Sequence, residues 1–291
     1  MSATAPPAPP RPAPDETPGS QVTEARVAPR IIVLSGPSGC GKSTQRDQLL
    51  RADPNREFLV SYTTRMPRAG EVDGKDYHFL ILKYLTDGQR KRLISPEKQI
   101  TAEQLSSFTP EEISAAQTKA NAEFARIKTE GTTLFESVDF YGNSYGTPKA
   151  QLLRALHAGK QLIADVNLDG LRAFQAAYPQ QVCGIFIAPQ SKETIAQRLQ
   201  IRIDEAGELS HARRAQMEAE KNERLSKYDA IMNESQHYPI VIEQKDMTPA
   251  QTHQHIEDRI SNYTPSQTAT RTHVGRANAT GNNNVAYRNQ H

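Results

Sequence analysis

The chain has 291 residues, and its 35 lysines and arginines nearly balance its 33 aspartates and glutamates, which leaves a net charge of +2. This balance gives no electrostatic reason to expect a nucleic-acid partner, and no apolar run approaches the roughly 20 residues that a membrane helix requires. The two cysteines cannot form a disulfide framework. We therefore expect a cytoplasmic protein that has neither nucleic acid nor a membrane as its partner.

Both ends of the chain have compositions typical of segments that do not fold. Residues 1–29 hold eight of the 19 prolines, which predicts a disordered tail with polyproline character that is not a secretory signal. Residues 263–291 contain three arginines and no acidic residue. We expect a second, polar disordered tail there, either a solvated terminus or a docking arm for an acidic partner.

Between the tails, in residues 30–262, apolar runs of strand length alternate with helical patterns. Four β-branched apolar runs predict buried strands at residues 31–35, 161–166, 182–188 and 238–243. Apolar spacing and capping residues predict helices at residues 43–51, 147–158, 169–177, 192–202 and after Thr248-Pro249. Such alternation is typical of a parallel sheet with helices on both faces, so we predict an α/β fold.

Residues 80–131 interrupt this alternation. Thr109-Pro110-Glu111-Glu112 is a capping box with proline at the first helical position. Apolar residues follow at helical spacing, namely Ile113, Ala116, Ala120, Phe124 and Ile127. The pattern predicts a helix of roughly 15–18 residues. Because its stripe is thin and mostly alanine, we expect this helix to lie on the surface.

The residues that follow the first strand fit the phosphate-loop pattern G-x-x-x-x-G-K-[ST]. They are Gly36, Pro37, Ser38, Gly39, Cys40, Gly41, Lys42, Ser43 and Thr44. Glycines let backbone N–H groups turn inward around phosphate oxygens, and the next helix adds the positive end of its dipole. Lys42 would reach the terminal phosphates and Ser43 would hold Mg²⁺. The motif predicts a P-loop NTPase-type site for ATP or GTP; the alternative is a glycine-rich turn with a chance Lys-Ser.

Two further groups of residues suggest phosphate chemistry. Asp165 ends the second apolar strand, where a carboxylate in a phosphate-loop fold organises Mg²⁺; the alternative is a turn or cap residue. Arg65 and Arg68 lie in a stretch that is rich in hydroxyl groups and ends near Tyr77. Guanidinium groups match phosphate oxygens, so this stretch could hold an acceptor phosphate. The alternative is a polar surface loop.

Together these motifs resemble the guanylate kinase family. The resemblance covers about residues 30–260 and rests on GPSGCGKST, SYTTRMPRAGEVDGKDYHF, FESVDFYGNSYGTP, LIADVNLDG and the ARR…KYDAIMN pattern. It implies a core with the phosphate loop, a small GMP-binding lobe at about residues 61–148, and a mobile lid over ATP at about residues 198–214. The family converts ATP and GMP, or dGMP, into ADP and the diphosphate with Mg²⁺.

The resemblance also implies roles for individual residues. Its GMP-binding set would be Ser61, Arg65, Arg68, Glu71, Tyr77, Glu136, Tyr145 and Thr147. Its catalytic set would be Lys42, Arg65 and the lid arginines Arg198, Arg202 and Arg213, while Asn233 would contact adenine. Guanine presents adjacent N1–H and N2–H donors that Glu136 could accept. Adenine has no such pair, so a carboxylate there would select guanine.

The chain departs from the family pattern in three places. Asn167 stands where the family has a second aspartate, and Ile203 stands where glycine usually follows the second lid arginine. These changes put guanine selectivity or rate, and the lid hinge, in question. In addition, 58 residues separate Tyr77 from Glu136, many more than is usual. The resulting insertion, at about residues 84–130, could be a passive addition, a dimer contact or a regulatory element.

Two other functions compete with a GMP kinase. Guanylate-kinase-like domains exist that have lost catalysis and bind proteins, although in those the phosphate loop is typically degraded. A related kinase could act on a sugar phosphate, but such an acceptor does not require residues that recognise guanine, such as Ser61, Glu136 and Thr147. The sequence does not determine the oligomeric state.

Overall fold

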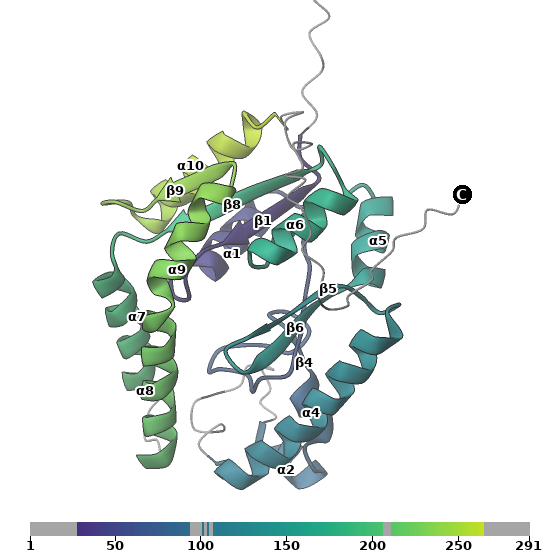
Figure 1. Cartoon of the computed structure of the whole chain (residues 1–291), viewed down its shortest axis with the longest axis vertical. Helices are drawn as coiled ribbons and strands as arrows, with labels where there is room; N and C mark the ends of the chain where they lie inside the picture. The colour runs from purple at the N-terminus through teal and green to yellow at the C-terminus, as the bar shows by residue number, and fades with distance from the viewer. Residues whose placement is uncertain (1–27, 94–100, 102–103, 105–106, 206–210, 265–291) are drawn as a thin grey trace, which may run out of the picture.

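The structure is a computed structural model, and it describes residues 28–93, 101, 104, 107–205 and 211–264. Two β-sheets organise this part of the chain (Figure 1). We call residues 61–148, which carry the smaller sheet, the small lobe, and the other described residues the core. The two predicted tails lie almost entirely outside the described residues.

The core is built on a five-stranded parallel sheet with the strand order β2-β7-β1-β8-β9. Its strands are β1 (Ile31–Ser35), β2 (Arg56–Phe58), β7 (Gln161–Asp165), β8 (Val182–Ala188) and β9 (Ile240–Glu243). All side chains of β1 and β8 are buried, as expected for strands covered on both faces. The predicted α/β fold is confirmed, and each predicted strand lies within two residues of its place.

Helices cover both faces of this sheet. They are α1 (Lys42–Ala52), α5 (Lys149–His157), α6 (Leu168–Ala177), α7 (Lys192–Asp204) and α10 (Pro249–Ser261). Leu49, Ile195 and Ile256 pack in the hydrophobic cluster on one face, while Leu152 and Phe174 pack in the cluster on the other. Burial on both faces fixes the positions of β1, which leads into the phosphate loop, and of β7, which ends at Asp165.

A long helix beside the five-stranded sheet completes the core. It is α8 (His211–Ser226), which packs along α7 and runs into α9 (Tyr228–Asn233) and the 3₁₀ helix η2 (Glu234–His237). Figure 1 shows α8 extending from the core alongside the small lobe. This arrangement places α8 where its side chains can contact the lobe.

The small lobe carries a four-stranded sheet with the order β4-β3-β6-β5. Its strands are β3 (Tyr62–Thr63), β4 (His78–Phe79), β5 (Leu134–Phe140) and β6 (Asn143–Pro148), and its short helices are η1 (Leu80–Tyr84) and α2 (Asp87–Leu93). Strands β5 and β6 form an antiparallel hairpin, and β3 pairs antiparallel with β6. The hairpin register sets Glu136 directly opposite Thr147.

Helix α4 (Pro110–Glu130) corrects the expectation of a surface helix. It has 21 residues, more than predicted, and begins at the expected capping box. Its apolar stripe is buried in a third hydrophobic cluster, in which Ala116, Ala120 and Phe124 pack with η1 residues. Alanine lets the helix approach closely, and a Cβ at Gly146 would lie 3.1 Å from the Phe124 ring. The insertion therefore shares the core of the small lobe.

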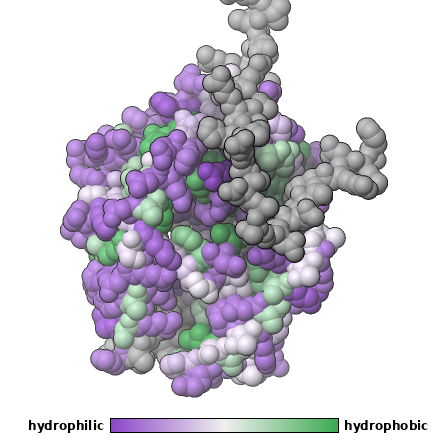
Figure 2. All heavy atoms as spheres, in the orientation of Figure 1, coloured by the Kyte–Doolittle hydropathy of each residue, from purple (hydrophilic) through white to green (hydrophobic). Residues whose placement is uncertain are grey.

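Polar residues dominate the face shown in Figure 2, with hydrophobic residues in scattered small groups. Within the described residues, no helix combines the length and apolarity that crossing a bilayer requires.

We predict that Phe124→Ala lowers the free energy of unfolding by about 3–5 kcal/mol, because it leaves a cavity in the third cluster. Urea denaturation followed by circular dichroism measures the change. Lys119→Ala, at an exposed position of the same helix, is the control and should stay within about 0.5 kcal/mol of wild type. Equal stabilities for the two variants would contradict the integral role of α4.

Candidate active site

A cavity of about 1140 Å³ opens between the core and the small lobe. Fifteen of the residues predicted for the site line it, and these are Gly36, Ser38, Gly39, Gly41, Lys42, Ser43, Ser61, Arg65, Arg68, Glu71, Tyr77, Glu136, Tyr145, Asp165 and Arg202. The other predicted residues whose side chains are described lie behind or beside the lining, and they are Pro37, Cys40, Thr44, Thr147, Arg198 and Asn233. The cavity thus brings together segments far apart in the sequence.

The loop after β1 requires glycine for two different reasons. Gly36 has a φ of 139°, and a Cβ there would lie 2.4 Å from the carbonyl oxygen of Ile187, so the neighbouring strand leaves no space for a side chain. Gly41 has a φ of 100° and caps α1 without any side-chain hydrogen bond. Lys42 and Ser43, the first residues of α1, line the cavity, so the N-terminal end of this helix lies at the cavity, as an anion site requires. Cys40 is fully buried beneath the loop, and burial raises the pKa of its thiol.

The side chain of Lys42 lies between the phosphate loop and the end of β7. Its Nζ donates to the carbonyl oxygens of Gly36 at 2.9 Å and Pro37 at 3.4 Å, and it lies 4.0 Å from Oδ1 of Asp165. Because β7 pairs with β1, with Asp165 opposite Leu34, the carboxylate emerges beside the loop. Burial raises the pKa of Asp165, and the charge of Lys42 opposes this shift.

An arginine–carboxylate pair shapes the wall of the small lobe. Both terminal nitrogens of Arg65 donate to Glu71 at 2.7 Å, and Glu71 also accepts from the backbone N–H of Arg68 at 2.7 Å. The Arg65 guanidinium lies 4.9 Å from the centroid of the Tyr77 ring. Burial opposes ionisation of Glu71, but the bonds from Arg65 outweigh it and lower the pKa of Glu71. The pair closes residues 65–71 into a compact loop.

Arginines from three segments gather at the cavity. Arg68 comes from the small lobe, Arg202 from α7 and Arg224 from α8, and all three line it. Burial, with repulsion from Arg65 and Arg224, lowers the pKa of Arg68 to about 10. Proteins place like charges together where an anion compensates them, so this grouping indicates a site for a polyanion.

Sequence reasoning missed Arg224. Its Nη2 donates to Oε2 of Glu220 at 3.0 Å, and its side chain is only 13% exposed. A charged helix of this composition gives no signal of which face lines a cavity, so the sequence could not distinguish Arg224 from its neighbours.

The predicted lid arginines are placed differently from one another. Arg202 lines the cavity, whereas Arg198 donates to the carbonyl oxygen of Gly39 at 3.1 Å. The side chain of Arg213 lies outside the described residues, and the neighbouring Arg214 is 3.5 Å from Asp204.

Glu136 reaches the cavity from the β5–β6 hairpin. The hydroxyl of Thr147, across the hairpin, donates to Oε1 of Glu136 at 2.5 Å. Thr147 is fully buried, so it orients the carboxylate from behind. Burial raises the pKa of Glu136, and the bond from Thr147 opposes this. With Ser61 and Tyr145 also lining the cavity, one carboxylate stands among neutral hydroxyl groups.

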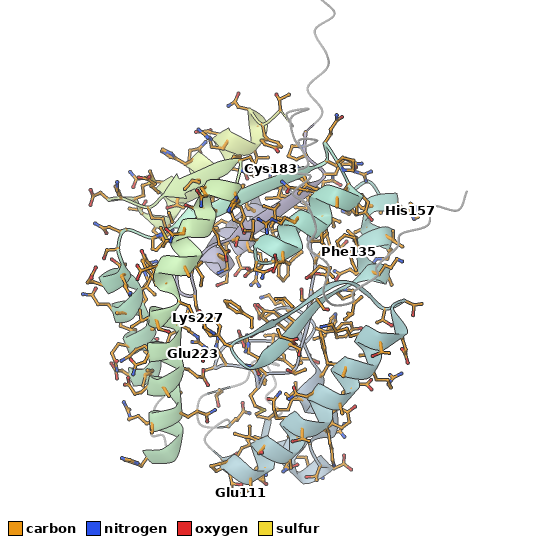
Figure 3. The ribbon with its side chains drawn as sticks, in the orientation of Figure 1. Glu111, Phe135, His157, Cys183, Glu223 and Lys227 are labelled. Carbon is orange, nitrogen blue, oxygen red and sulfur yellow. The ribbon has the colours of Figure 1, made fainter. Side chains whose placement is uncertain are left out.

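Two contacts join the small lobe to the core at the sides of the cavity. Arg46 of α1 stacks 4.6 Å from the centroid of the Phe58 ring, and its Nη2 donates to Oδ1 of Asp76 at 2.8 Å. At the hairpin tip, the ring centroid of Tyr141 lies 4.4 Å from Nζ of Lys227. Figure 3 labels Lys227, the residue between α8 and α9, and Glu223 of α8, whose Oε1 accepts from Nζ of Lys227 at 2.8 Å.

Asn167 and Ile203, the two residues that differ from the family pattern, both lie in the core. Asn167 caps α6, where its side chain accepts from the N–H of Gly170 at 3.1 Å. Ile203 is 2% exposed and lines the cavity next to Arg202. Helix α7 continues through Ile203 and ends at Asp204.

We predict that Glu71→Ala lowers the free energy of unfolding at pH 7 by about 3–5 kcal/mol, because it leaves the buried Arg65 without its partner. The folded-state pKa of Glu71 lies below its ordinary 4.5, so the carboxylate stabilises the fold above pH 4.5. This contribution is lost as the pH falls through the lowered folded-state pKa. Denaturation from pH 7 to pH 3 should show the gap between wild type and variant narrowing below pH 4.5; a constant gap would contradict the ion-pair origin.

Comparisons with known proteins agree on one family. The family model for guanylate kinase matches residues 28–100 and 120–250. The guanylate kinase of Desulfitobacterium hafniense strain Y51 is 32% identical over 202 residues, covering 69% of this chain and 80% of the relative. That of Thermobifida fusca strain YX is 34% identical over 196 residues, covering 66% and 79%. The crystal structure of guanylate kinase from Anaplasma phagocytophilum, 23% identical, shares the fold with a TM-score of 0.50 over 80% of this chain and 85% of that one.

Proposed function

The chain belongs to the guanylate kinase family, and on this basis we propose that it transfers the γ-phosphoryl group of ATP to GMP or dGMP. Membership makes the chain a P-loop enzyme, a transferase that phosphorylates nucleoside monophosphates. The identity of both nucleotides rests on the residues of the cavity. The observation that carries the proposal is Glu136, a carboxylate that lines the same cavity as the phosphate loop.

The donor nucleotide would bind through the phosphate loop. The amides that follow Gly41 and the ammonium group of Lys42 supply positive charge for the β- and γ-phosphates. Lys42 donates to carbonyl groups of the loop itself. Phosphate oxygens would replace these carbonyls as its acceptors. The predicted contact of adenine with Asn233, at the end of α9, belongs to the same proposal.

The acceptor base would be read by Glu136. Its carboxylate, held by Thr147, can accept from both N1–H and N2–H of guanine, while Ser61 provides a hydroxyl at the same cavity. A base without these donors would leave a largely buried carboxylate unpaired, which costs several kcal/mol. Selection of guanine over adenine follows from this cost.

The acceptor phosphate would lie between the base-reading end and the donor. Arg65 and Arg68 offer guanidinium groups. Tyr77 and Tyr145 offer hydroxyl groups, and burial raises the pKa of Tyr77. Arg65 is already fixed by Glu71. Because this side chain is already ordered, it loses little conformational entropy when the acceptor binds.

Arginines from the opposite side would stabilise the transferring group. Phosphoryl transfer spreads negative charge over equatorial oxygens, and the protein contributes by positioning and neutralisation. Arg202 and Arg224 line the cavity. Arg198 and Arg213 would join them when the predicted lid, residues 198–214, closes.

Ser43 and Asp165 fit a magnesium ion in the cavity that they both line. Hydroxyl and carboxylate oxygens are ligands that Mg²⁺ prefers, and the ion commonly takes one or two protein ligands together with substrate phosphates and water. In the described part of the chain, no group of three or more His, Cys, Asp or Glu side chains could coordinate a metal ion. When bound, the ion would neutralise charge on the donor phosphates. Asp165 also keeps Lys42 directed at the loop.

We predict that ADP forms from ATP and Mg²⁺ with GMP or dGMP as the acceptor at a kcat/KM about 10²-fold or more above that with AMP or CMP. A coupled assay for ADP measures each acceptor. Lys42→Ala, which removes a contact to the transferring group, should lower kcat by about 10²- to 10³-fold. Equal rates with AMP would refute the base assignment. A folded protein that turns over no nucleotide would instead be a protein-binding module.

We also predict that Glu136→Gln raises the KM for GMP by about 10- to 100-fold, because an amide cannot accept from both base donors, and leaves the KM for ATP nearly unchanged. Since burial raises the pKa of Glu136 above 4.5, protonation should raise the wild-type KM for GMP at pH values somewhat above 4.5. Steady-state kinetics from pH 8 to pH 5 measure this rise. Glu136→Gln should show no such rise in the KM for GMP at low pH. The same rise in both proteins would mean that another group causes it.

A further inference from the structure

One wall of the cavity comes from residues that the family model does not match. The unmatched stretch, residues 101–119, separates the two matched ones, and the N-terminal half of α4 falls within it. Four of its residues line the cavity, namely Pro110, Ile113, Ser114 and Gln117. Residues 65–71, the loop of Arg65 and Glu71, line the same cavity. The insertion is therefore part of the site.

The beginning of α4 is held firmly in place. Thr109 and Glu112 form a complete capping box, and Arg92 donates to Oε1 of Glu112 at 2.6 Å. The guanidinium of Arg92 also lies 4.5 Å from the centroid of the Phe108 ring. One turn further on, Ala116 is buried in the third hydrophobic cluster. These contacts fix the backbone from which Gln117 projects.

Gln117 joins α4 to the acceptor loop. Its Nε2 donates to the carbonyl oxygen of Thr64 at 2.8 Å and to Oδ1 of Asn121 at 2.9 Å. Thr64 is fully buried. Its N–H donates to the carbonyl oxygen of Ser144 at 3.1 Å, and its hydroxyl accepts from the N–H of Ser144 at 3.0 Å. Gln117 thus satisfies the remaining polar group of Thr64.

The carbonyl group that Gln117 holds is part of the peptide group that leads into Arg65. A planar peptide group moves as a unit, so the direction of this carbonyl sets the direction in which the Arg65 backbone leaves β3. Without Gln117, a buried carbonyl would lack its partner, which favours rotation of the peptide group toward another donor. Such a rotation would displace the guanidinium that Glu71 orients.

We propose that Gln117 is a positioning residue for Arg65 and that the inserted helix thereby completes the subsite for the acceptor phosphate. The inference rests on the proposed function, because the acceptor is the nucleoside monophosphate. It assigns a role in the reaction to a segment that lies outside the family pattern. Gln117 itself acts through the Thr64–Arg65 peptide group and makes no contact with the reacting atoms.

The first test is a comparison of Michaelis constants. Gln117→Met keeps the length of the side chain and removes its donor, and Gln117→Glu sets an acceptor against the Thr64 carbonyl. Both variants should raise the KM for GMP by about 5- to 20-fold, while the KM for ATP stays within about twofold. Asn121→Ala, which removes the other acceptor of Gln117, is the matched control and should keep the wild-type KM for GMP. Gln117 variants with wild-type KM values would overturn the inference.

The second test needs no nucleotide. Hydrogen–deuterium exchange of the full chain should be faster in the segment of residues 61–68 for Gln117→Met than for wild type or Asn121→Ala, with the other strands unchanged. If wild type fails to phosphorylate GMP, the proposed function falls, and exchange still decides the inference. Faster exchange confined to that segment supports the positioning of Arg65 by Gln117. Unchanged exchange overturns it.

Discussion

The small lobe depends on the ion pair between Arg65 and Glu71. Two hydrogen bonds of 2.7 Å and a third from the backbone of Arg68 close the loop between them. A largely buried, bidentate pair of this kind is costly to break, since either partner alone would be a desolvated charge. Contacts among its own residues therefore give the loop its shape. The orientation of Arg65 over Tyr77 and the direction of Arg68 both follow from it.

The other organising constraint is the excess of positive charge at the cavity. Arg68, Arg202 and Arg224 approach from three segments, and burial together with repulsion from Arg65 and Arg224 lowers the pKa of Arg68 to about 10. Proteins group like charges where an anion compensates them, and phosphate groups would do so here. The Tyr141–Lys227 contact joins the lobe to the junction of α8 and α9 without adding a negative charge to the cavity.

The sequence was most informative where local residues dictate the structure. The phosphate loop and the buried strands β1 and β8 were predicted within a residue or two, because glycine positions and continuous apolar runs carry that information locally. Strands β3 and β4 have two residues each, too few for any periodicity. The apolar stripe of α4 can be buried because Gly146, which is distant from most of α4 in the sequence, has no side chain that would collide with Phe124. The position of Arg224 depends on how α8 is oriented. The roles of Glu136 and the lid arginines remain predictions from family resemblance, supported by where their side chains lie.

The burial of the thiol groups has a practical consequence. Alkylating reagents and peroxides attack exposed thiolates, but Cys40 is buried beneath the phosphate loop and its raised pKa keeps it protonated. Cys183, inside β8, is equally inaccessible, and burial raises its pKa to about 12. Here the folded state buries both sulfur atoms, so we expect neither thiol to react readily with such reagents.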